Sequence, residues 1–536
     1  MRNKTVLTLV AYPILCALAV HITQPQAAQA QPGPAGPATP ATPAAPGDRG
    51  GTSPASTNAP GMRGGGARGG FGAGMGAGGG ARGPAIPAIS TNAPGMPGVA
   101  MPDPAVGRKA KWPVRDAVNS PPEGLTARSP QNNGFYRRDA QGNIILGTDL
   151  YLWAPSGHFS NYDQDDLPPY SLPDALVMKD GRRVTSAEMW FKERRPELIN
   201  LFKDNIYGRV PEDKLPKIIW EVRQNDRTSN TITKTIIGYF EGTTPPPTNA
   251  ATPGAGAGGF GGGGMGGFGR GGGGGNTITI TLTLPNIGHP VPVFFGGPVN
   301  NPQGHGWGTG NVSGNAGVVA RISPPQGQPR PGNFPGNYAV TGWAFSRAMD
   351  YLATDKDVDA AHITIAGMST GGKQVLYTAA MDDRIWCVVP ESSGAMGVKL
   401  SRRDVGETID DLASGSFAGN YCPNMTNYIG HWNDMPVDQH EMIALMAPRK
   451  MFLTGGNQEN WQDVKGGFLA AVAVEAVYIL LGKKGINTVE MPPIERPIVF
   501  GEIGFYQHNG AHTFTANERT WITAWMEQFL PSAPAQ

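Results

Sequence analysis

The fold of this 536-residue chain is decided by one stretch, which reads His362-Ile363-Thr364-Ile365-Ala366-Gly367-Met368-Ser369-Thr370-Gly371-Gly372-Lys373. Its first five residues are typical of a short buried strand, which leads directly into a Gly-x-Ser-x-Gly motif. A helix is expected to follow. In this strand–turn–helix context the motif indicates a nucleophile elbow, whose glycines permit a sharp turn that exposes the hydroxyl of Ser369. The amide of Thr370 then faces a developing oxyanion at the start of the helix.

The flanking patterns alternate between helix and strand. Residues 343–353 have an apolar stripe at helical spacing, and residues 385–389 are typical of the next buried strand. Strand, helix and strand in this order predict a right-handed parallel unit. Residues 450–454 are expected to form a late core strand, and residues from about 516 to 529 a final helix. We therefore expect an α/β fold.

The same stretch also fits a second motif. Gly367, Gly372 and Lys373 match the Gly-x-x-x-x-Gly-Lys pattern of a phosphate-binding loop, which also joins a strand to a helix. That loop needs Ser or Thr next, to hold magnesium, and here the next residue is Gln374. The pattern therefore favours the nucleophile elbow.

A serine nucleophile needs a histidine base, which in this type of fold follows the serine. Four histidines lie downstream, at positions 431, 440, 508 and 512. His512 lies in a loop just before the final helix, where the fold places its base, and we expect it to be catalytic. His508 is the competing residue, and His440 is expected to be structural.

The acid that orients the base is expected in the loop after the strand at 450–454. Glu459 is the first choice and Asp463 the second, because both follow this strand closely. Glu391, directly after the strand at 385–389, is a third possibility. Sequence reasoning leaves these alternatives open.

Composition excludes several kinds of protein. The formal net charge is +1, whereas nucleic-acid binding normally requires a basic patch. Three cysteines are too few for a disulfide scaffold. Cys16 lies in the predicted signal peptide, so Cys387 and Cys422 remain, either as a disulfide or as buried thiols.

The N-terminus has the layout of a secretory signal peptide. Arg2 and Lys4 precede an apolar stretch from Val6 to Val20, and Ala28-Gln29-Ala30 fits a cleavage site. We predict a signal peptide at residues 1–30 and a secreted or periplasmic protein that is not membrane-bound after cleavage. An uncleaved membrane anchor is the alternative.

Two low-complexity segments are expected to be disordered. Glycine and proline total 127 residues (77 and 50), and they are concentrated in a linker at 31–130 and an insertion at 245–275. Such segments bury too little apolar surface to offset the entropy of ordering. The insertion separates two strand-like runs, 231–240 and 276–284, so we expect it to extend a hairpin tip. The enzyme domain is predicted at 131–536.

From about Tyr162 to the C-terminus the chain resembles the glucuronoyl esterases, carbohydrate esterase family fifteen, in their bacterial form. The resemblance rests on several blocks: Asn205-Ile206-Tyr207-Gly208-Arg209-Val210-Pro211, Leu400-Ser401-Arg402-Arg403, Gly406-Glu407-Thr408-Ile409, Pro436-Val437-Asp438-Gln439-His440-Glu441, Ala447-Pro448-Arg449 and Trp461-Gln462-Asp463. It implies an α/β-hydrolase three-layer sandwich with a central, mostly parallel sheet. It also implies cleavage of the ester between 4-O-methylglucuronic acid of glucuronoxylan and lignin alcohols, without a cofactor or metal, by what we expect to be a monomer.

The resemblance also assigns site residues. Ser369 matches the nucleophile, His512 the base, and Glu459 the acid position used by bacterial members. Lys373, Glu407 and Trp461 match residues that bind the sugar. The serine, histidine and glutamate together predict a Ser-His-Glu triad.

Three positions depart from the family pattern. Met368 replaces a cysteine, and Thr370 replaces an arginine that assists the oxyanion hole. Ser392 stands where the family often has its acid, with Glu391 one residue early. Two functions are therefore considered: a working carbohydrate esterase whose substrate or rate differs, and a divergent member that binds a carbohydrate acid but turns it over poorly.

Overall fold

The computed structural model describes residues 125–127, 134–138, 144–153, 159–161, 167, 170–244, 276–413, 415–429 and 432–530. The predicted signal peptide, most of the predicted linker, the insertion at 245–275 and His431 lie outside the described residues. Strand β1 (Leu125–Ala127) falls inside the range predicted as linker. It opens a small antiparallel sheet with β2 (Gly134–Arg138), β3 (Ile144–Trp153) and β4 (Phe159–Asn161), in the order β1-β2-β3-β4.

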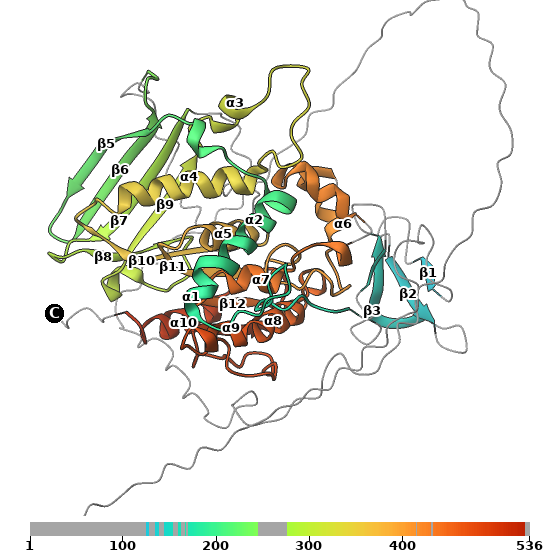
Figure 1. The fold of residues 1–536 in the computed structure, drawn as a ribbon. Helices are drawn as coiled ribbons and strands as arrows, with labels where there is room; N and C mark the ends of the chain where they lie inside the picture. The colour runs from blue at the N-terminus through green and yellow to red at the C-terminus, as the bar shows by residue number, and fades with distance from the viewer. Residues whose placement is uncertain are drawn as a thin grey trace, which may run out of the picture. The chain divides into compact units, whose positions relative to one another are not determined.

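The main sheet has nine strands in the order β13-β12-β11-β10-β8-β9-β7-β6-β5 (Figure 1). Its strands are β5 (Ile218–Arg227), β6 (Thr231–Phe240), β7 (Thr277–Pro285), β8 (Val291–Phe295), β9 (Gly308–Gly314), β10 (Val358–Met368), β11 (Ile385–Glu391), β12 (Lys450–Gly456) and β13 (Ile503–His508). The pairings from β13 to β9 are parallel, and those from β9 to β5 are antiparallel. The predicted mostly parallel sheet is confirmed. So is the hairpin of β6 and β7, in which Tyr239 pairs with Thr277 next to the insertion.

Ten α-helices accompany the sheet in the described residues. They are α1 (Ala187–Met189), α2 (Arg195–Phe202), α3 (Val318–Ile322), α4 (Asn337–Leu352), α5 (Thr370–Met381), α6 (Ile409–Leu412), α7 (Gln439–Ala444), α8 (Val464–Ala473), α9 (Glu475–Leu480) and α10 (Ala516–Met526). Wider turns at Trp190–Arg194 and Lys203–Tyr207 extend α2 at both ends. Short 3-10 turns lie at Glu212–Lys214, Pro302–His305, Gly415–Asn420, Pro423–Tyr428, Trp432–Asp434 and Asn460–Gln462. None of the helices in these ranges is long and apolar enough to cross a bilayer.

Helices cover both faces of the main sheet because successive strand residues point to opposite sides. Phe295 packs edge-on against Phe345 of α4, with ring centroids 5.3 Å apart, and belongs to the larger core cluster. Its neighbour Phe294 belongs to a second cluster with Trp525 of α10. These two buried clusters confirm the three-layer arrangement. Cys387 and Cys422 are both buried free thiols, which resolves the question left open by sequence.

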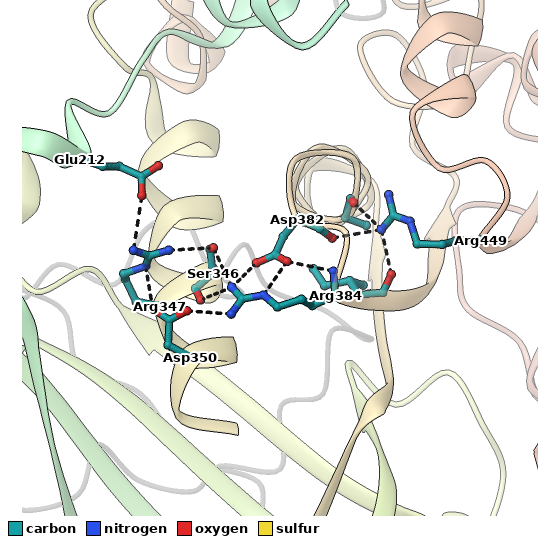
Figure 2. Close-up of polar contacts among 9 residues, drawn as sticks. Glu212, Ser346, Arg347, Asp350, Asp382, Arg384 and Arg449 are labelled. Atoms are coloured by element: carbon teal, nitrogen blue, oxygen red, sulfur yellow. Dashed lines mark hydrogen bonds and ion pairs between the residues drawn. The ribbon is translucent and has the colours of Figure 1, made fainter. Parts of the chain in front are cut away.

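A polar network joins α4 to the turn between α5 and β11 (Figure 2). Arg384 forms ion pairs with Asp350 of α4 at 2.7 Å and with Asp382 at 2.6 Å. On the other side of the turn, Arg449 donates to the carbonyl oxygens of Ala379, Asp382, Ile385 and Leu445 at 2.8–3.0 Å. Burial lowers the pKa of Arg449 to about 10. By donating to these carbonyl oxygens, the guanidinium caps the C-terminus of α5.

Replacing Arg449 tests how much its hydrogen bonds contribute to the stability of the fold. Arg449→Met should lower the free energy of unfolding by about 3 kcal/mol, because it leaves buried carbonyl oxygens without donors. Lys192→Met is the control, since Lys192 pairs with Glu188 and both side chains are more than 70% exposed. That variant should change stability by less than about 0.5 kcal/mol. Urea unfolding measures both, and equal losses would contradict the role given to Arg449.

Candidate active site

The turn at Ser369 has the strained backbone of a nucleophile elbow. Ser369 lies between β10 and α5 with φ 58° and ψ −123°, a region that residues other than glycine seldom adopt. The turn is held by the amide of Ser369, which donates to the carbonyl oxygen of Glu391 at 3.0 Å. A Cβ at Gly367 would lie 2.4 Å from the carbonyl oxygen of Gly371. The motif therefore needs glycine here because the backbone closes on itself.

The elbow lies at the same end of the sheet as the predicted acid, Glu459, and the predicted base, His512. Strands β10, β11, β12 and β13 are adjacent and parallel, so their carboxyl ends meet at that edge. Ser369 follows β10, Glu459 follows β12 and His512 follows β13. Ligands of open α/β sheets bind in the crevice at this edge.

The structure joins His512 to Glu459. His512 Nδ1 lies 2.7 Å from Glu459 Oε2, and because a carboxylate only accepts, this nitrogen carries the proton. The other oxygen, Oε1, accepts from the amide of Gly456 at 2.7 Å and from the hydroxyl of Ser392 at 2.8 Å. The Glu459 side chain is 2% exposed and that of His512 is 38% exposed. A buried acid thus holds an accessible imidazole with its Nε2 free of hydrogen bonds to described residues.

Ser369 is near this pair in the fold but is not bonded to it. Among the described residues, its hydroxyl makes no hydrogen bond to His512. Catalytic hydrogen bonds are often long in the absence of substrate and tighten in the complex. Thr370 is the first residue of α5, so its amide lies at the helix N-terminus beside the nucleophile, as predicted.

The competing base has another environment. His508 Nε2 faces the carbonyl oxygen of Ala511 at 3.0 Å, and Nδ1 lies 3.0 Å from Glu518 Oε1, an ion-pair contact that lacks hydrogen-bond geometry. Burial alone would lower the pKa of His508, but the contacts with Glu518 and the Ala511 carbonyl oxygen, together with the charge of Glu459, raise it. His508 is 2% exposed, and its contact with the Ala511 carbonyl oxygen lies one residue before His512, so it supports the loop of His512. His440 is also buried, with Nε2 at 2.8 Å from the Pro173 carbonyl oxygen, a structural contact.

The two other candidate acids do not contact His512. Asp463 pairs with Arg403 Nε at 2.9 Å and caps α8 by accepting from the amide of Gly466. Glu391 contacts Ser392, with Oε1 at 2.7 Å from the hydroxyl, and so reaches Glu459 only through that serine. Sequence reasoning did not assign this bridging role to Ser392, because it considered only charged groups as partners for the base.

The predicted sugar-binding residues are linked to one another by hydrogen bonds, and Lys373 lies one helical turn after Ser369. Lys373 Nζ donates to Glu407 Oε2 at 2.5 Å and to the carbonyl oxygen of Ser393 at 2.6 Å. The carbonyl oxygen of Trp461 accepts from the amide of Glu407 at 2.8 Å, which fixes this residue beside the pair. Sequence reasoning missed Gln462. Its buried Oε1 lies so close to Gly394 that a Cβ there would be 2.1 Å away, and among the described residues this oxygen has no hydrogen-bond partner. No cluster of His, Cys, Asp or Glu in the described ranges is arranged to hold a metal ion.

Comparison with known proteins agrees with this geometry. The family described as "Glucuronyl esterase, fungi" matches residues 333–482, which include the elbow, Lys373, Glu407 and Glu459. Carbohydrate esterase MZ0003, from an unknown prokaryotic organism, is 28% identical over 412 residues, which cover 70% of this chain and 94% of that protein. The chain is thus similar to glucuronyl esterases over residues 333–482 and to a carbohydrate esterase over most of its length.

Other relatives delimit the shared region. The glucuronoyl esterase from Solibacter usitatus has a similar structure, with a TM-score of 0.58 at 26% identity, covering 68% of this chain and 99% of that one. The 4-O-methyl-glucuronoyl methylesterase 1 of Wolfiporia cocos (strain MD-104) is 28% identical over 155 residues, 27% of this chain and 38% of that protein. Similarity to the bacterial glucuronoyl esterase thus extends through most of the fold, whereas similarity to the fungal protein is confined to a shorter segment.

The contact between His512 and Glu459 leads to a prediction for this protein. Glu459→Gln should lower kcat on the order of 10³-fold, because the neutral amide cannot stabilise the imidazolium by charge. Asp463→Asn is the comparison: it loosens Arg403 and the cap of α8, so it should lower Tm and leave kcat largely unchanged. Steady-state kinetics and thermal melts of both variants decide the matter, and a greater loss of kcat in Asp463→Asn contradicts the assignment.

Proposed function

We propose that this protein is a secreted serine esterase that hydrolyses glucuronate esters of carbohydrates, of the kind that joins lignin alcohols to glucuronoxylan. The observation that supports it is the contact of buried Glu459 with the accessible imidazole of His512, at the same sheet edge as the strained elbow of Ser369. These residues supply a nucleophile, a base and an orienting acid, which ester hydrolysis requires.

The proposed mechanism has two steps. The hydroxyl of Ser369 attacks the ester carbonyl carbon as its proton passes to His512 Nε2, while Glu459 stabilises the resulting imidazolium. The oxyanion accepts a hydrogen bond from the amide of Thr370. The intermediate then releases the alcohol, which takes the proton from Nε2, and leaves an acyl-enzyme. Water attacks the acyl group with the same proton transfers and frees the uronic acid.

Sugar recognition is assigned to Lys373 and Glu407. An ammonium group has three donors, and Lys373 spends two of them on Ser393 and Glu407. Glu407 Oε2 accepts from Lys373 and from the amide of Ala395 at 3.1 Å, and Oε1 has no partner among the described residues. One donor and one acceptor thus remain for sugar hydroxyls, and Trp461, whose carbonyl oxygen accepts from the amide of Glu407, is assigned to the sugar ring.

A second function is favoured by Thr370. The family arginine would place a charged donor near the oxyanion, and charged hydrogen bonds are roughly twice as strong as neutral ones. With threonine in its place, a divergent protein that binds a carbohydrate acid and turns it over poorly, or an esterase for a different carbohydrate ester, is the alternative.

Activity measurements on wild type and on a Ser369 variant distinguish the esterase from the binding protein. Wild type should hydrolyse benzyl glucuronate in preference to an acetylated xylose, and Ser369→Ala should abolish turnover without lowering Tm, because only an accessible hydroxyl is removed. Product release by chromatography and binding by calorimetry measure both properties. If wild type binds the ester tightly but does not hydrolyse it, the alternative function as a carbohydrate-binding protein is supported. Unchanged turnover in Ser369→Ala excludes the serine mechanism.

Restoring the arginine tests the oxyanion hole. Thr370→Arg should raise kcat on benzyl glucuronate more than it lowers KM, because the added donor acts on charge that develops in the transition state. Thr370→Met is the control, since it adds length without a donor. Initial rates over a range of ester concentrations separate kcat from KM. No gain from arginine means that the pocket is shaped for another ester.

A further inference from the structure

One hydroxyl connects two buried carboxyl groups beneath the site. Ser392 Oγ lies 2.7 Å from Glu391 Oε1 and 2.8 Å from Glu459 Oε1. A serine hydroxyl has a single hydrogen, so it donates to only one of the two. If both carboxyl groups were ionised, one oxygen would face the lone pairs of the hydroxyl. The geometry therefore requires a proton on one of the glutamates.

The surroundings indicate which glutamate carries that proton. Glu459 is placed among donors: the amide of Gly456, the hydroxyl of Ser392 and the imidazole of His512. Glu391 is 1% exposed, and its second oxygen, Oε2, has no hydrogen-bond partner in the described part of the chain. Hydrogen bonds to the charged form favour ionisation and burial opposes it, so the proton belongs on Glu391.

The nearby charges agree with this placement. Glu391 faces the carboxyl groups of Glu518 on α10 and of Glu459, which raise its pKa, while the charge of Arg519 lowers it. Arg519 is engaged elsewhere, donating to the carbonyl oxygens of Gly297 and Phe514, both at 3.2 Å. His508 lies against Glu518 rather than Glu391. Burial first, and then the charge of Glu518, raise the pKa of Glu391 well above its ordinary value.

We propose that Glu391 is a positioning residue that acts as a neutral acid: it donates to Ser392, which in turn donates to Glu459. The chain of donors then runs from Glu391 through Ser392 to the carboxylate that holds His512. The backbone of Glu391 also accepts the amide of Ser369, so this one residue supports both the nucleophile and the acid. The catalytic consequence rests on the proposed esterase function, whereas the position of the proton does not.

Two substitutions of similar size test the donor. Glu391→Gln keeps a neutral group that donates to Ser392, so kcat on benzyl glucuronate should stay within about threefold of wild type. Glu391→Met fills the space without a donor and should lower kcat by about tenfold or more, with KM little changed. A severe loss in Glu391→Gln would mean that an ionised Glu391 is needed. Equal activity of the two variants would mean that the residue only fills space. Either result overturns the proposal.

Ser392→Ala tests the link by itself. Removing the hydroxyl should cost at least as much kcat as Glu391→Met, since Ser392→Ala deletes the donor to Glu459 itself, whereas Glu391→Met deletes only the group that orients this donor. Adding Glu391→Met to Ser392→Ala should then cost nothing further, because residues in one hydrogen-bond chain are not additive. A full second loss in the double variant overturns the relay.

The pH dependence of stability locates the proton without any measurement of turnover. A glutamate that stays protonated in the folded state and ionises in the unfolded state releases a proton on unfolding, so rising pH favours unfolding. Between about pH 5 and pH 9 the Tm of wild type should therefore fall relative to that of Glu391→Gln. An ionised Glu391 would bind no proton in either state over this range, so the difference in Tm between wild type and Glu391→Gln would stay constant; that result would overturn the proposal, even in a protein that hydrolyses no ester. An inactive wild type that shows the expected trend would instead overturn only the proposed function.

Discussion

The parallel register at the carboxyl ends of β10, β11 and β12 is the constraint on which the site depends. Two backbone hydrogen bonds fix it: the amide of Ser369 to the carbonyl oxygen of Glu391 at 3.0 Å, and the amide of Ser392 to that of Thr454 at 2.8 Å. These bonds continue the sheet one residue beyond each strand. They place the nucleophile, the bridging serine and the loop of Glu459 side by side before any side chain is considered.

Much of this arrangement could be predicted because its signals are local. The elbow is specified by glycines next to Ser369, where a Cβ would collide with backbone, and the hairpin of β6 and β7 by alternation within each strand. The loops before α10 and after β12 are short and follow adjacent parallel strands, so a histidine and a glutamate in them lie close together, and the structure pairs His512 with Glu459.

The network beneath the site could not be predicted, because it depends on which way side chains turn at strand ends. Ser392 has φ 41°, so the chain leaves β11 in a left-handed turn. Neither residue next to Ser392 is a glycine, so the sequence does not predict this turn. This turn directs its hydroxyl toward both Glu391 and Glu459. Sequence reasoning treated Glu391 and Glu459 as alternatives for one role. The structure shows them at two ends of a single chain of contacts.

The charge balance of the site suits a neutral substrate. Lys373 is compensated by Glu407 at 2.5 Å, and Glu459 faces three donors, so neither the proposed sugar subsite nor the surroundings of the proposed base carry a large excess of charge. A uronate ester is uncharged, whereas the acid that hydrolysis releases is an anion. An uncompensated lysine would attract that anion and retard its release, because a buried unpaired charge is strongly stabilised by a counter-ion. The buried ion pair instead leaves directional hydrogen bonds for the sugar hydroxyls, which are the same in ester and acid. Under the proposed function, the pairing of Lys373 with Glu407 therefore favours recognition of the sugar ring without retention of the product.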